Sequence, residues 1–406
     1  MIPRVHPTYT PAELRAALFP TRDAVAEFER ELAVNFGMKH ALAFPYGRSA
    51  IHATFRALDL AGQVVQPAYN CVVVAHATVL SGNQPIFVDC QSGDPNQDAD
   101  AMIRAVSAQT TAVVPTSIFG IPFDATALVA AIRRKNPRAF VLMDCAQGFD
   151  VRSQDALIAA QGDAAILAFG IGKAMTTLFG GALLTDRDDV AQAVRNYRDR
   201  SFRSSSVGRS LGRLAYFFAS WIAVTGQGVR AFDLVEQSGA LQAKFLKSLR
   251  SRESVRLPKD NQIMMADREA AIGRAQLPRL SAFIKRREEI STIYRRALRD
   301  VRGVHLLDWR HGATHTIYAL CLDDSLRRAE VLGGLRRRGV QGGAVLDYVV
   351  PDLECYRERG SAGEFPNARA WARQVLNLPN HPTLTDAQVE YCASALRAVL
   401  ESCESR

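Results

Sequence analysis

The chain has 406 residues, 48% hydrophobic and 22% charged, and its formal net charge at pH 7 is +9. This length exceeds one ordinary core, so we expect two domains of a soluble globular protein. No stretch has the apolar length of a membrane span, and the N-terminus lacks the apolar segment of a signal peptide. A basic chain can bind nucleic acid, anionic lipid or phosphorylated small molecules. No recognition-helix, RNP or zinc-finger signature is present, so nucleic acid is not an expected partner.

The cysteines are odd in number and scattered, without a Cys-x-x-Cys pair. They stand at Cys71, Cys90, Cys145, Cys321, Cys355, Cys392 and Cys403. This usage fits a reducing compartment better than a disulfide framework or a zinc site. We therefore expect a cytoplasmic protein without a metal centre.

Three helices and a strand are predicted at the start of the chain. Thr10 and Thr21 are predicted helix N-caps, and the second helix ends at Gly37. The apolar residues 40–44 are predicted to form a strand, and residues 50–58 a helix.

The turn between that strand and helix is a candidate phosphate site. It reads Pro45-Tyr46-Gly47-Arg48-Ser49. Free N–H groups and the dipole at a helix N-terminus favour an anion, and glycine lets the backbone approach it closely. The donors would be the N–H groups of Arg48 and Ser49 and the Ser49 hydroxyl. An ordinary helix cap is the alternative that this turn alone leaves open.

Short apolar strands then alternate with amphipathic helices. Strands are predicted at 63–67, 85–89, 111–115 and 139–144, and helices at 70–80, at 98–106 and from Asp124 onwards. This pattern indicates an α/β domain with a mostly parallel sheet, whose ligands bind at the carboxyl ends of the strands.

Asp144 and Gln147, in the sequence MDCAQG, lie at one of these strand ends. An aspartate that closes an apolar strand is costly unless it meets a cation or hydrogen-bond donors. A protonated pyridine nitrogen would be such a partner. A local turn cap is the alternative.

Lys173 stands on a glycine-rich turn between an apolar strand, 164–169, and a second strand that opens with Gly180-Gly181. Burial lowers the pKa of an amine because the charged form loses its hydration. Such an amine is suited to Schiff-base chemistry with a carbonyl. The alternative is a strand-end lysine whose ammonium reaches water.

Residues 201–256 separate a large domain, 1–200, from a small C-terminal domain, 257–406. The segment is rich in serine and arginine, contains the apolar run 214–224, and is predicted to be a helical excursion. Burial against the protein or a partner subunit is the favoured interpretation of the run. Contact with a membrane surface is the alternative.

The small domain is predicted to contain a helix pair within 266–289 and short strands within 303–322. A helix that ends at Gly339 follows, and a last helix begins at Thr385-Asp386. This pattern predicts a small α/β domain folded over one edge of the large one.

Taken together, these motifs resemble the DegT/StrS group of pyridoxal-phosphate-dependent sugar aminotransferases. The resemblance spans nearly the whole chain. FGMKHALAFPYGRSAIHATFRAL is similar to the opening of the family, MDCAQG to its Asp-x-Ala-Gln/His motif, and AFGIGKAMTTLFGGALLT to its Ser-Phe-x-x-x-Lys…Gly-Gly motif. It implies fold type I: a large domain with a mostly parallel central sheet flanked by helices, and a smaller C-terminal α/β domain.

The resemblance also implies a role for each matching residue. Lys173 would form the Schiff base, as an internal aldimine, with pyridoxal 5'-phosphate and then act as general base and acid. Asp144 would keep the pyridine nitrogen protonated, and Gln147 would hydrogen-bond the phenolic oxygen. The turn at 47–49 would hold the phosphate.

Several positions depart from the family pattern. The phosphate-binding serine before the phenylalanine is Ala168, and the asparagine that serves the partner subunit falls at Gln262. The aromatic residue that stacks on the ring falls at Cys71, for which Tyr69 is a candidate substitute. Because Ala168 lacks the hydroxyl of that serine, Arg48 would bind the phosphate instead, and its guanidinium suits a phosphate.

These expectations favour an aminotransferase of polysaccharide or antibiotic biosynthesis. It would move an amino group from an amino acid, glutamate in particular, to a nucleotide-linked keto-sugar. The resemblance also implies a homodimer, because active sites of this fold form at the subunit boundary. Two alternatives remain open: a pyridoxal-phosphate enzyme of another reaction type (elimination, racemisation or carbon–carbon bond formation on an amino acid), and a non-catalytic regulatory protein on the same fold.

Overall fold

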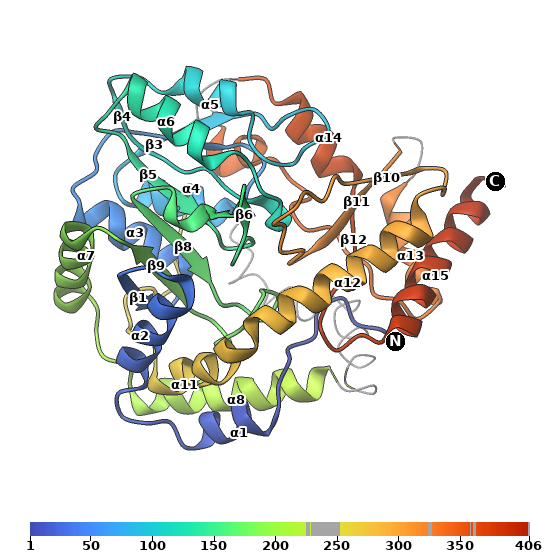
Figure 1. The fold of residues 1–406 in the computed structure, drawn as a ribbon, viewed down its shortest axis with the longest axis horizontal. Helices are drawn as coiled ribbons and strands as arrows, with labels where there is room; N and C mark the ends of the chain where they lie inside the picture. The colour runs from blue at the N-terminus through green and yellow to red at the C-terminus, as the bar shows by residue number, and fades with distance from the viewer. Residues whose placement is uncertain (225–227, 229–251, 324–326, 358, 360–362, 405–406) are drawn as a thin grey trace.

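The computed structural model describes all residues except 225–227, 229–251, 324–326, 358, 360–362 and 405–406. A seven-stranded sheet forms the centre of its larger part, with the order β1-β9-β8-β5-β4-β2-β3 (Figure 1). The strands are β1 (His40–Phe44), β2 (Gln63–Pro67), β3 (Gln84–Val88), β4 (Thr110–Val113), β5 (Phe140–Asp144), β8 (Ala164–Ala168) and β9 (Gly181–Thr185). Strand β9 pairs antiparallel with both β1 and β8, and the other neighbouring strands of this sheet pair in parallel.

Helices cover both faces of this sheet because successive residues of each strand point to opposite sides. In β5, Val141 and Met143 belong to one buried cluster, and Leu142 belongs to another. The first cluster includes α2 (Ala24–Phe36), α5 (Ala99–Ala105), α6 (Ala125–Lys135) and α11 (Asp267–Gln276). The second includes α3 (Gly47–Ala57), α4 (Val72–Leu80) and α7 (Asp188–Ser201). Burial on both faces explains why the strands are continuously apolar.

The small domain contains a three-stranded antiparallel sheet of order β10-β11-β12. Its elements are β10 (Val304–Leu306), β11 (Tyr318–Leu322), α13 (Arg328–Arg337), α14 (Pro366–Gln374), β12 (Val375–Leu378) and α15 (Asp386–Glu404). The long helix α12 (Leu280–Leu298) joins the two domains (Figure 1). Leu280 lies in a core of the large domain, whereas Ile290, Tyr294 and Leu298 lie in the core that contains the small sheet.

The apolar run of the 201–256 segment lies on helix α8 (Val207–Ala223), which packs beside α1 (Pro11–Leu18) and α11. Phe217 is fully buried against Tyr9 and Trp221. One face of this helix is therefore buried against the protein, as predicted for the apolar run. Val207 and Ile222, on the same helix, are exposed. None of the described helices is long and apolar enough to span a membrane.

The predicted order of elements is confirmed, with differences at element ends. Helix α3 begins at Gly47, earlier than the predicted start at residue 50. The elements β12, α14 and a short hairpin of β6 (Arg152–Ser153) and β7 (Ala156–Leu157) were not predicted. Residues 225–227 and 229–251 of the predicted excursion lie outside the described residues. The boundary at residue 257 stays a prediction, and we note that α11, which follows it, packs on α1 and α2.

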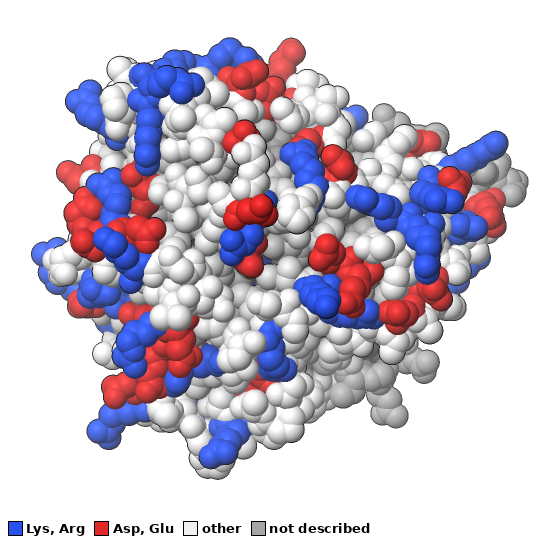
Figure 2. Space-filling view, in the orientation of Figure 1, with Lys and Arg blue, Asp and Glu red and all other residues white. Residues whose placement is uncertain are grey.

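Basic and acidic side chains are interspersed over the face shown in Figure 2. Nucleic-acid binding depends on clustered lysine and arginine side chains that meet phosphates. This face therefore offers no continuous basic surface among the described residues.

Candidate active site

A cavity of about 310 Å³ opens where the parallel strands end, and we call it the sheet-edge cavity. The carboxyl ends of parallel strands meet at one edge of a sheet, so segments far apart in sequence converge there. The structure brings seven of the predicted site residues to its wall: Gly47, Arg48, Cys71, Asp144, Gln147, Ala168 and Lys173.

Lys173 follows β8, on the turn that leads to β9. Its N–H donates to the carbonyl of Gly170 at 2.9 Å, and Thr177 N–H donates to the carbonyl of Phe169 at 3.0 Å, so the turn is held by its own backbone. Burial lowers the pKa of Lys173, and the nearby Cys71 and Asp144 act in the opposite direction. A lysine amine with a lowered pKa is available in its neutral, nucleophilic form.

Asp144 ends β5 and is buried. Its Oδ1 accepts a hydrogen bond from Ala146 N–H at 3.0 Å. Burial raises the pKa of Asp144, with Ala146, Lys173 and Asn70 opposing the shift. A cation bound in the cavity would relieve the desolvation of this carboxylate.

Two polar residues beside Asp144 were not predicted as site residues. Asn70 and Thr116 both line the sheet-edge cavity, and Asn70 Nδ2 donates to Thr116 Oγ1 at 2.9 Å. Each follows the end of a strand, β2 or β4. Their position just after a predicted strand is the feature of the sequence from which they could have been predicted.

Gln147 presents a donor to the cavity. Its Oε1 accepts the N–H of Phe119 at 2.8 Å. Because a backbone N–H can only donate, this bond fixes the amide orientation and leaves the side-chain NH₂ for another acceptor. Gln147, which is predicted to hydrogen-bond a phenolic oxygen, therefore presents the donor that this bond requires.

The N-terminus of α3 lies against the same cavity. No side chain caps this helix, whose first residues Gly47 and Arg48 line the cavity wall. The backbone of β9 approaches it closely: a Cβ on Gly181 would lie 2.3 Å from the Gly47 nitrogen. An uncapped helix N-terminus attracts anions through its free N–H groups and its dipole. Arg48, which is half-buried and whose pKa is lowered by burial, adds a cation at this point.

Three predicted site residues do not line the cavity. The Ser49 hydroxyl donates to Asn261 Oδ1 at 2.6 Å and the Ser49 N–H to the Tyr46 carbonyl, so both phosphate donors expected from Ser49 are occupied. Tyr69 is fully buried in the core, where it packs against aromatic rings, and it cannot substitute for the stacking residue. Gln262 is exposed at the surface.

A second cavity of about 280 Å³ adjoins the first, and we call it the interdomain cavity. The two share Cys71, Gln147 and the 170–173 turn, so Lys173 lies between them. The remaining wall comes from residues 4–6, from α12 and from the small domain. Among these, Arg287 was not predicted as a site residue.

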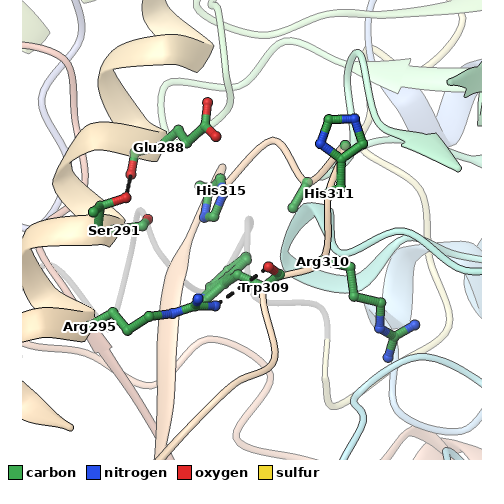
Figure 3. A pocket seen from close by; sticks show the side chains of 10 residues that line it. Glu288, Ser291, Arg295, Trp309, Arg310, His311 and His315 are labelled. Atoms are coloured by element: carbon green, nitrogen blue, oxygen red, sulfur yellow. Dashed lines mark hydrogen bonds between the residues drawn. The ribbon is translucent and has the colours of Figure 1, made fainter. Parts of the chain in front are cut away.

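A third cavity, of about 130 Å³, lies between α12 and residues 309–315 (Figure 3). Arg295 donates there to the carbonyl of Trp309 at 3.5 Å. The His315 ring packs at a tilt against Trp309, with 4.5 Å between ring centroids, and burial lowers the pKa of His315 to about 4. None of the lysine, aspartate or glutamine residues of the sheet-edge cavity lines it, so we do not assign the chemistry to this place. Among the described residues, no group of three or more metal-ligating side chains could hold a metal.

Comparison with known proteins adds to this geometry. Residues 12–397 match the DegT/DnrJ/EryC1/StrS aminotransferase family. The chain belongs to this family. The family predicted from the motifs is thus confirmed, and the match covers both domains of the fold.

Two relatives show what members of the family do. The chain is 24% identical, over 92% of its length and 89% of the relative, to a dTDP-4-amino-4,6-dideoxy-D-glucose transaminase from Shigella dysenteriae. It is 28% identical, over 94% of its length and 89% of the relative, to a dTDP-4-dehydro-2,3,6-trideoxy-D-glucose 4-aminotransferase from Saccharopolyspora spinosa.

The fold is also shared with a solved structure. The putative sugar aminotransferase Spr1654 from Streptococcus pneumoniae, in its PLP form, superimposes with a TM-score of 0.77 at 18% identity over 99% of both chains. The predicted fold class, fold type I with a large and a small domain, is confirmed.

Proposed function

We propose that the protein is a pyridoxal-phosphate-dependent aminotransferase that moves an amino group from an amino acid to a nucleotide-linked keto-sugar. The observation that carries this proposal is the convergence of Lys173, Asp144 and Gln147 on one cavity beside the uncapped N-terminus of α3. Membership of an aminotransferase family supports the reaction class.

The residues present fit pyridoxal 5'-phosphate. Asp144, a buried carboxylate whose pKa burial raises, is placed to meet a protonated pyridine nitrogen. The NH₂ of Gln147 suits the phenolic oxygen, and the start of α3 with Arg48 suits the phosphate. When bound, the cofactor supplies an electron sink for charge that develops at the substrate carbon.

Lys173 has two tasks in this proposal. Its amine attaches the cofactor, and afterwards it moves a proton at the substrate carbon that carries the amino group. Burial lowers the pKa of Lys173, which keeps a fraction of the amine neutral and able to accept that proton.

The acceptor class comes from the relatives, whose names specify dTDP-linked sugars. We propose a nucleotide-linked keto-sugar as acceptor, glutamate as donor, and a role in polysaccharide or antibiotic biosynthesis. A net charge of +9 is compatible with a diphosphate substrate. All seven cysteines are unpaired, which supports action in the cytoplasm.

We also propose a homodimer. Gln262, which matches the position that serves the partner subunit in the family, is exposed and away from the cavity of its own chain. An exposed residue of this kind can reach a neighbouring subunit.

The test is the donor half-reaction. L-Glutamate mixed with the holoenzyme is expected to yield one 2-oxoglutarate per active site, with a change in the visible spectrum of the cofactor. Lys173→Ala removes the proton-transfer group and should slow this conversion by about 10²–10⁴-fold. Undiminished conversion by Lys173→Ala would contradict the proposed role. A racemised, decarboxylated or eliminated product from glutamate would indicate another reaction type.

A further inference from the structure

The interdomain cavity carries positive charge and is not lined by any acid. Its wall includes ionisable side chains at Arg4, His6, Cys71, Lys173, Arg287 and His381, and none of the described lining residues is Asp or Glu. A cavity with this composition favours an anionic ligand.

Arg287 is the buried cation of this wall, with 5% of its surface exposed. Its guanidinium makes only long bonds to backbone carbonyls, to Ala174 at 3.3 Å, Lys173 at 3.4 Å and Phe283 at 3.4 Å, and its Nε has no partner among the described residues. Carbonyl oxygens do not neutralise a guanidinium, and a buried charge without a counter-ion is costly. Burial accordingly lowers the pKa of Arg287 to about 10.

The adjacent arginine on the same helix shows the contrast. Arg286 lies outside the cavity and contacts two carboxylates, Asp386 at 2.6 Å and Glu289 at 3.0 Å. Arg286 thus has acidic partners, whereas Arg287 faces a cavity instead.

The two histidines of the wall have structural tasks. His381 Nε2 donates to the carbonyl of Pro3 at 3.1 Å, so its Nδ1 accepts from the hydroxyl of Thr383 at 2.8 Å. His6 stacks on His381 at 5.2 Å between ring centroids. Burial lowers the pKa of both rings, so both are neutral at pH 7. The histidines therefore add no charge to the wall, and Arg287 is its buried arginine.

We propose that Arg287 binds a carboxylate of the amino-acid donor in the interdomain cavity, an inference that rests on the proposed function. The guanidinium contacts the backbone carbonyl of Lys173 itself, so an amino acid that reacts at this lysine would have its carboxylate within reach. The planar fork of a guanidinium matches a carboxylate. A volume of about 280 Å³ lies at the small end of ligand sites and suits glutamate rather than a whole nucleotide-sugar.

The first experiment separates donor from acceptor. Arg287→Gln in the holoenzyme should raise KM for L-glutamate by about 10- to 100-fold, as expected for a lost charge-assisted hydrogen bond, while KM for the keto-sugar stays unchanged. Arg286→Gln is the matched control and should leave both values unchanged. Arg287→Lys retains the charge, so its KM for L-glutamate should lie between those of Arg287→Gln and wild type. An unchanged KM for glutamate, or an equal rise for both substrates, would overturn the assignment.

The second experiment measures binding without turnover. By calorimetry, glutarate is expected to bind the wild-type holoenzyme and to lose about 10- to 100-fold in affinity in Arg287→Gln, whereas dTDP affinity stays the same. If dTDP binding is lost and glutarate binding kept, the anion is the diphosphate and the inference is wrong. If the wild-type holoenzyme does not convert glutamate at all, the proposed function is wrong. The comparison of glutarate affinity between wild type and Arg287→Gln still tests whether Arg287 binds a carboxylate.

Discussion

At the residue scale, burial acts in opposite directions on the pKa values of Lys173 and Asp144, which both line the sheet-edge cavity. It lowers the pKa of Lys173 and raises that of Asp144, because each loses hydration of its charged form. The lysine is thereby readied as a base. The buried aspartate would be stabilised by a cationic partner, and in the function that we propose this partner is the pyridine nitrogen of the cofactor.

Asp144→Asn tests this assignment. The substitution removes the anion and nearly preserves shape, so we expect the rate of the glutamate half-reaction to fall by about 10²–10³-fold. We expect no loss in the free energy of unfolding of the cofactor-free protein, because a neutral amide is less costly to bury than a carboxylate. Rapid-mixing absorbance and urea denaturation measure the two quantities. A wild-type rate in Asp144→Asn would contradict the role of the carboxylate.

The sequence predicted the site residues that belong to local motifs. It did not predict site residues whose environment depends on a contact with a distant part of the chain. Lys173, Asp144 and Gln147 stand at strand ends that the apolar pattern locates. The hydroxyl of Ser49 is taken by Asn261, which no local pattern reveals. Arg287 belongs to the charged run 286–289, which has the composition of a solvated helix face, although packing against the 173 turn buries this one member.

At the element scale, the position of the α3 N-terminus depends on the glycine pair that opens β9. Gly180 has φ +105°, a conformation that side chains other than glycine rarely adopt. Gly181 lies so close to α3 that a Cβ would meet both the nitrogen and the Cα of Gly47 within 2.4 Å. The phosphate site that we propose would thus be built by backbone contact between a strand and a helix.

Gly181→Ala should push α3 away from the sheet. We expect the free energy of unfolding to fall by about 1–3 kcal/mol or more, as in other overpacked cores, together with weaker pyridoxal-phosphate affinity. Gly170→Ala is the control for stability, because a Cβ there would meet no atom within 4 Å. Urea denaturation and cofactor titration give the two readouts. If Gly181→Ala and Gly170→Ala have the same free energy of unfolding, the contact between Gly181 and Gly47 does not fix the position of α3.

The elements that the sequence missed are those that tertiary pairing creates. Strand β5 is a run of apolar residues bounded by turns and was predicted within one residue at its start. Strand β12 has only four residues, begins directly after α14, and pairs with β11 from a distant part of the chain. Short apolar runs of this kind do not distinguish strand from helix without their partners.

At the scale of the whole molecule, helix α12 and the first ten residues connect the two domains around the interdomain cavity. Residues 2–4 bond to 339–341 of the small domain, and Thr10 caps α1 against the large domain. His381 holds this segment through the Pro3 carbonyl. The donor site that we propose is therefore assembled from segments of both domains.

The buried histidines predict acid sensitivity of the fold. Burial lowers the pKa of His381 to about 3 and that of His315 to about 4, from an ordinary value of 6.5. The unfolded chain therefore takes up these protons first. This contribution to stability is complete above about pH 6.5 and is lost as the pH falls towards 4, by up to about 1.4 kcal/mol per pH unit for each histidine.

Urea denaturation between pH 7 and pH 4 measures this slope. His381→Gln removes one titrating group and should flatten the dependence of the free energy of unfolding on pH. An unaltered slope in His381→Gln would show that the buried ring does not govern the acid transition.

The attachment of the cofactor at Lys173 is the central claim, and reduction of the holoenzyme with borohydride tests it most directly. After digestion, peptide mass mapping is predicted to find a pyridoxyl group on Lys173 and on no other lysine. A pyridoxyl group on a different lysine, or a Lys173 peptide that stays unmodified, would contradict the account.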